Sequence, residues 1–71
     1  MQEFAKRLKY QRLKRGYNQQ QIANVMNVSQ VSVSNWERGV KEPNFSKLIQ
    51  LSKLFGQTTD YMLGVSDKEG V

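Results

Sequence analysis

Polar side chains recur between residues 30 and 38 at a spacing that would place them together on one face of a helix. This face holds Gln30, Val31, Ser34, Asn35 and Arg38. Val33 and Trp36 fall on the opposite side at about 100 degrees of rotation per residue. Carboxamides can pair with adenine, hydroxyls can bond to several base edges, and valine can meet a thymine methyl group. Ordinary surface helices are also polar outside, so the neighbouring elements must decide what this face does.

The residues before this helix predict how it is held. Residues 19–26 have helical composition, and Ala23 supplies the small residue that two steeply crossed helices need where they touch. Asn27 follows, and asparagine tolerates left-handed backbone better than most residues other than glycine. Ser29 can then cap the next helix. This order predicts a helix-turn-helix, the layout that places its second helix in a DNA major groove.

Length and composition exclude several classes of protein. A chain of 71 residues makes one domain with a small core, and it contains no cysteine and no histidine. Disulfides, zinc fingers, most transition-metal sites and histidine-dependent triads are therefore absent. We find neither a paired acidic cluster nor a glycine loop for phosphate, and so predict no enzyme, no metal and no cofactor. No apolar run approaches the ~18 residues of a membrane span, and no secretory signal is evident, which predicts a cytoplasmic location.

The formal charge of +5 is unevenly distributed along the chain. Residues 1–16 hold six basic residues and one acidic residue, which gives 6 minus 1, or +5, in that segment alone. The C-terminal end reverses the sign, with Asp60, Asp67 and Glu69 against Lys68. Such asymmetry predicts a polyanion bound at one end of the molecule. The alternative is a solvated basic helix that binds nothing.

Three further helices are predicted around the motif. Residues 2–15 carry apolar side chains at Phe4, Ala5, Leu8 and Leu13, and Gly16 ends this segment. Asn18 and Gln21 form a pattern similar to a capping box at the start of the second helix. After Gly39 and Pro43, residues 45–55 form a helix between the cap Asn44 and the terminator Gly56, and Thr58 caps a short fifth helix.

These elements predict an all-α domain over residues 1–64, followed at 65–71 by a flexible tail or the start of a linker. The pattern contains no strand-like alternation. The predicted core consists of Phe4, Leu8, Tyr17, Ile22, Ala23, Met26, Val28, Val33, Trp36, Leu48, Leu51, Leu54, Phe55 and Leu63.

The basic first helix, the stretch YNQQQIANVMNVSQVSVSNWERG, the Pro43 loop and FGQTTDYMLG together resemble the DNA-binding domain of the Cro and lambdoid-repressor family, the Xre family of bacterial and phage regulators. The resemblance covers about residues 4–64. It implies a compact five-helix repressor-like domain whose second and third helices form the helix-turn-helix. It also implies a homodimer that represses transcription at a palindromic double-stranded DNA operator, since one such domain buries too little surface for tight selective binding.

The resemblance assigns roles to individual positions. A glutamine that opens the second helix contacts a phosphate and braces the first residue of the recognition helix, which implies these roles for Gln19 and Gln30. An arginine of the first helix that pairs with a glutamate of the third while facing a phosphate corresponds to Arg12 and Glu37. The expected base contacts are Gln30, Val31, Ser34 and Asn35. The expected phosphate contacts are Gln19, Arg12, Arg38, Lys41 and Asn44. Expected structural positions are Ala23, Asn27, Val33, Trp36 and Glu37, and the dimer contact falls on Val40 to Pro43 and Gln57 to Leu63.

Plainer readings stay open at several of these positions. Gln19 can be a simple exposed residue at the start of its helix, and Gln30 can touch only phosphate. Val31 can be an ordinary exposed residue, and Ser34 can face solvent or phosphate. Arg12 and Glu37 can form a simple exposed ion pair.

The remaining positions also have simpler roles. Trp36 fits packing better than DNA contact, Arg38 and Lys41 can be solvated charges, and Asn44 fits a helix cap. At the level of function, the alternatives are an antitoxin-type regulator and a helical protein-interaction module without DNA binding.

Two residues depart from the family pattern. Gln11 stands where many relatives carry leucine, and we expect Leu13 to take over its packing. Asn27 replaces the glycine that is usual in the turn.

Overall fold

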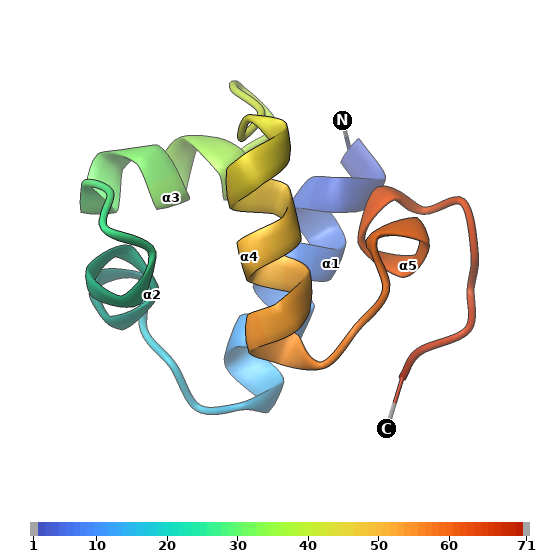
Figure 1. The fold of residues 1–71 in the computed structure, drawn as a ribbon. Helices are drawn as coiled ribbons and strands as arrows, with labels where there is room; N and C mark the ends of the chain where they lie inside the picture. The colour runs from blue at the N-terminus through green and yellow to red at the C-terminus, as the bar shows by residue number, and fades with distance from the viewer. Residues whose placement is uncertain (1, 71) are drawn as a thin grey trace.

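Side-chain caps begin four of the five helices in this computed structural model, which describes residues 2–70 (Figure 1). The helices are α1 (Gln2–Lys14), α2 (Gln19–Met26), α3 (Gln30–Glu37), α4 (Phe45–Phe55) and α5 (Thr59–Leu63). The caps Asn18, Ser29, Asn44 and Thr58 each accept a backbone hydrogen bond from three residues further along. These bonds satisfy N–H groups that a helix start leaves unpaired. The predicted all-α fold is confirmed.

The core lies where α4 crosses in front of α1, with α2 and α3 on one side and α5 on the other (Figure 1). Its largest fully buried apolar side chains come from all five helices. They are Phe4, Leu8, Ile22, Met26, Val33, Leu51, Phe55 and Met62. Four predicted core residues, Tyr17, Val28, Leu54 and Leu63, pack against this cluster while only partly buried. No helix within residues 2–70 is long and apolar enough to span a bilayer.

The packing register of α1 differs from the prediction at two positions. Leu13 is 58% exposed, whereas Gln11 is fully buried, so the expectation that Leu13 takes over was wrong. The helical period explains this, because position 11 lies seven residues after Phe4 and three after Leu8, on the same face. The Gln11 amide is stabilised there by donating hydrogen bonds to the Tyr61 hydroxyl at 3.2 Å and to Glu69 at 2.7 Å.

The turn between α2 and α3 depends on Asn27. This residue adopts φ 57° and ψ 46°, and it is the only non-glycine residue with positive φ among residues 2–70. The left-handed step lets the amide of Val28 donate to the carbonyl of Ala23 at 3.0 Å. Ala23 itself is fully buried at the crossing of the two helices, as the sequence predicts.

Two substitutions of Asn27 should therefore show how strongly the left-handed backbone limits which residue this turn accepts. Asn27→Ala is expected to lower the free energy of unfolding by about 1 kcal/mol, because a Cβ without a local polar partner disfavours left-handed backbone. Asn27→Gly should leave stability nearly unchanged. Urea denaturation of both variants measures the difference, and equal losses in the two would contradict this account of the turn.

Candidate nucleic-acid interface

Helix α3 is fixed by its inner face and presents its outer face to solvent. Val33 is fully buried and Trp36 is 6% exposed, so both belong to the core. On the other side Gln30 and Val31 are exposed, with Val31 63% exposed, while Ser34 and Asn35 are half-buried. The structure thus gathers all four predicted base contacts on one accessible surface.

A nearly buried ion pair ties α3 to α1. Arg12 Nε donates to Glu37 Oε2 at 2.6 Å, and Arg12 Nη2 donates to Glu37 Oε1 at 3.0 Å. The two side chains are 10% and 4% exposed, which excludes the reading of a simple exposed pair. Arg12 Nη1 also donates to the Tyr17 carbonyl at 3.0 Å. Planar, bidentate pairing of this kind fixes both groups in one orientation.

The same carboxylate orients two glutamines. Gln19 Nε2 donates to Glu37 Oε1 at 3.2 Å, and Gln30 Nε2 donates to Gln19 Oε1 at 2.5 Å. Because a carboxylate only accepts, Gln19 must turn its amide nitrogen toward Glu37 and its oxygen toward Gln30. Gln30 must then donate to Gln19. This relay leaves Gln30 with its carbonyl oxygen and one N–H for a further partner, the pattern that adenine accepts in the major groove.

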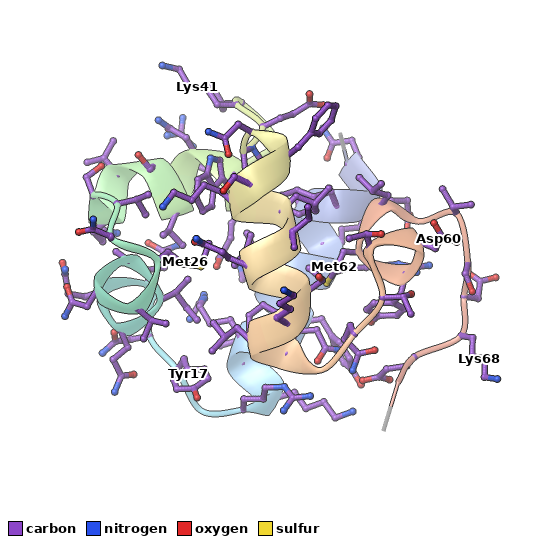
Figure 2. The ribbon with its side chains drawn as sticks, viewed as in Figure 1. Tyr17, Met26, Lys41, Asp60, Met62 and Lys68 are labelled. Atoms are coloured by element: carbon purple, nitrogen blue, oxygen red, sulfur yellow. The ribbon has the colours of Figure 1, made fainter. Side chains whose placement is uncertain are left out.

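The remaining predicted contacts lie beyond the end of α3. Arg38 is exposed and its Nη1 donates to Asn35 Oδ1 at 3.3 Å. Lys41 extends outward from the loop between α3 and α4 (Figure 2). The Asn44 oxygen accepts from the Lys47 amide at 2.8 Å, so this side chain caps α4. Arg38 and Lys41 are therefore exposed cations close to the end of α3.

Much of the charge of α1 is directed away from this surface. Arg7 and Lys14 form ion pairs with Asp67 and Glu69, and Arg15 donates to the carbonyl of Phe55. The basic and acidic ends of the sequence are therefore folded against each other. Arg7 and Lys14 lie seven residues apart and therefore on one face of α1, which is a spacing that the sequence already shows.

An apolar cavity of about 150 Å³ opens beside the start of α4, lined by Phe4, Glu42, Pro43, Phe45, Leu48 and Leu63. Phe45 is 85% exposed and Val40 is 58% exposed. The predicted dimer region is only partly accessible, because Gln57, Tyr61 and Met62 are buried.

Within residues 2–70 no group of three or more acidic, histidine or cysteine side chains is placed to hold a metal ion.

Comparisons with known proteins agree with this geometry. A family model described as helix-turn-helix matches residues 8–62. The regulator ImmR of Bacillus subtilis is 42% identical over 59 residues, which are 83% of this chain and 46% of ImmR. DicA of Escherichia coli is 38% identical over 64 residues, 89% of this chain and 47% of DicA. This chain spans about half the length of these curated relatives.

Among solved structures, the c2 repressor of Salmonella phage P22, crystallised with a synthetic operator, superposes with a TM-score of 0.81. The two are 34% identical, and the match covers 87% of this chain and 94% of the repressor chain. The chain belongs to the helix-turn-helix family of Xre, or Cro/C1-type, transcriptional regulators.

Proposed function

We propose that this chain binds double-stranded DNA sequence-specifically and acts as a transcriptional repressor, as a dimer on a palindromic operator with α3 in the major groove. The observation that carries the proposal is the exposed face of α3, on which Gln30 is oriented by Gln19 and Glu37. A repressor of the same fold, crystallised with an operator, supports it. Residues 1–64 form the binding domain in this proposal.

The proposed DNA contacts fall into two groups, those to base edges and those to phosphates. Gln30, Val31, Ser34 and Asn35 read base edges, since their amides, hydroxyl and methyl groups match donors, acceptors and the thymine methyl. Gln19, Arg38, Lys41 and Asn44 meet phosphates. Arg12 is 8% exposed, and its three hydrogen bonds leave part of its five-donor guanidinium for a phosphate at its edge.

Selection of binding sites from random duplex DNA tests this function directly. We expect two inverted half-sites with centres about one helical turn apart, because twofold symmetry in the protein is matched by the operator. Recovery of single, unpaired half-sites would contradict the dimer. No enrichment at micromolar protein would contradict specific DNA binding and favour a protein-interaction module.

Salt dependence provides an independent prediction. The logarithm of the binding constant should fall with the logarithm of salt concentration with a slope of about minus 5 or steeper, because each phosphate contact releases counterions. Fluorescence anisotropy with a labelled selected duplex at several salt concentrations measures this slope. A flat dependence would show that the exposed cations do not meet a polyanion.

The dimer contact is proposed at the apolar surface around Phe45. A ring that is 85% exposed beside an apolar cavity can insert into the same cavity of a second copy, which is how a twofold interface complements itself. Phe45→Ser should weaken binding to a full palindrome by tenfold or more while leaving half-site binding unchanged, on the order of 1.4 kcal/mol of lost contact. Gel-shift titrations on both duplexes measure this. Equal weakening on the two would place Phe45 in DNA contact instead.

A further inference from the structure

The last described residues, 65–70, pass beside α5 on the side of the molecule away from α2 and α3 (Figure 1). We call this segment the strap. Its two acidic residues each meet a cation of α1: Asp67 Oδ1 lies 2.8 Å from Arg7 Nη2, and Glu69 Oε2 lies 2.5 Å from Lys14 Nζ. The strap therefore follows a defined path along α1.

Arg7 anchors the first half of the strap. Besides Asp67, its guanidinium donates to the carbonyl of Ser66 at 2.5 Å and to the carbonyl of Tyr61 at 2.7 Å. It also lies over the Tyr61 ring, 4.6 Å from the ring centre, and its side chain is only 15% exposed. Because α5 holds Arg7 through Tyr61, the group is oriented independently of the strap.

The Glu69 carboxylate is bound by the buried side-chain amide of Gln11. Gln11 is fully buried, and its Nε2 donates both to the Tyr61 hydroxyl at 3.2 Å and to Glu69 at 2.7 Å. Arg15 Nε donates to Gln11 Oε1 at 3.4 Å, which keeps the amide nitrogen directed at Glu69. A carboxylate thus finds an N–H and an ammonium group that converge on one oxygen.

The position after the carboxylates admits only glycine. The Gly70 amide donates to Gln57 Oε1, and a Cβ built at this position would lie 2.5 Å from the carbonyl oxygen of Gly56. Lys68, between the two acidic residues, is exposed and points outward at the edge of the molecule (Figure 2). The strap therefore contacts the rest of the chain at positions 67, 69 and 70, with the Asp67 side chain itself 99% exposed, while Lys68 points outward.

We propose that Arg7, Gln11 and Lys14 of α1, together with Gln57 and Tyr61, form a recognition site for an extended acidic peptide of the pattern Asp-x-Glu-Gly, and that the strap is its displaceable built-in occupant. The ligand class is a peptide segment with two carboxylates two residues apart and a following glycine. This inference does not depend on DNA binding.

The charges around the strap favour docking at neutral pH. The pKa of Glu69 is lowered, first by the hydrogen bond from Lys14 and then by that from Gln11, with Arg15 adding a smaller attraction. Asp67 faces Arg7, which also meets Glu3 at 3.4 Å and lies over Tyr61. A lowered carboxyl pKa means that docking is fully favoured above the ordinary glutamate value and is lost as the pH falls through the lowered one.

The test uses the full chain labelled with ¹⁵N. In the variant Asp67→Asn/Glu69→Gln we expect the Gln11 side-chain amide and Gly70 amide signals to move away from their wild-type positions. Adding the amidated peptide Val-Ser-Asp-Lys-Glu-Gly should return the Gln11 signals toward wild type, saturating in the millimolar range because exposed ion pairs contribute little. The wild-type chain should respond less than the double variant at each peptide concentration, since its tethered strap competes for the site at a millimolar effective concentration.

Matched controls make the outcome specific. The peptide Val-Ser-Asn-Lys-Gln-Gly should cause no shift. Adding Lys14→Gln to the double variant should weaken the response several-fold, whereas adding Lys9→Gln, an exposed position on the same helix, should preserve it. Unchanged Gln11 and Gly70 signals in the double variant would show that the carboxylates do not hold the strap. If the signals shift in the double variant but do not change on adding the acidic peptide, the site does not bind peptides.

Discussion

Glu37→Ala is expected to lower the free energy of unfolding by about 3–5 kcal/mol, because removing one partner of a buried ion pair leaves the other charge without compensation. The remaining partner, Arg12, is 8% exposed and would keep only its bond to the Tyr17 carbonyl. Native proteins have a total stability of about 5–15 kcal/mol, so this variant should lose a large part of its free energy of unfolding. Urea denaturation followed by Trp36 fluorescence measures the loss.

Two comparison variants identify the cause. Replacing both partners, as Arg12→Met/Glu37→Leu, should recover most of the stability, since an apolar pair of similar size avoids the cost of burying charge. Lys14→Gln breaks a pair whose side chains are 49% and 29% exposed, and it should cost less than about 1 kcal/mol. If Lys14→Gln and Glu37→Ala destabilise equally, burial is not the origin of the effect.

Gln30→Ala should weaken binding to the selected operator by about 1–3 kcal/mol and relax the preference at one base pair in each half-site. The reason is the relay, which leaves one donor and one acceptor of Gln30 directed outward. Anisotropy titrations with the selected duplex, and with duplexes altered at single positions, measure both the affinity and the preference.

Arg38→Ala is the matched comparison for Gln30→Ala. Arg38 is exposed at the end of α3, and as a phosphate contact it should contribute equally to selected and random duplexes and to the salt slope. Equal weakening of selected and random DNA by Gln30→Ala would assign Gln30 to the backbone and contradict its role in base reading.

Features encoded by neighbouring residues were predictable from the sequence. Asn18, Ser29, Asn44 and Thr58 begin helices as predicted because each cap bonds to an amide three residues away. The left-handed turn at Asn27 is equally local. The inward direction of Val33 and Trp36 follows from helical periodicity alone.

Features that depend on partners distant in sequence were not predictable. Gln11 lies 50 residues from Tyr61 and 58 from Glu69, so nothing near it in the chain indicates a buried amide. The basic helix and acidic C-terminal end were apparent as charges, but their pairing required the fold. The orientation of Gln30 likewise depends on side chains of α1 and α2 as well as α3.

The relay from Arg12 through Glu37 and Gln19 to Gln30 has a consequence for engineering. If α3 were grafted onto another helix-turn-helix scaffold that lacks Gln19 and Arg12, Gln30 would be present, but its amide could turn either way and accept different bases. Transferring the proposed operator preference therefore requires at least one residue from each of three helices. A prediction of the preferred base from the residues of α3 alone would therefore omit Arg12 and Gln19, which help to orient Gln30.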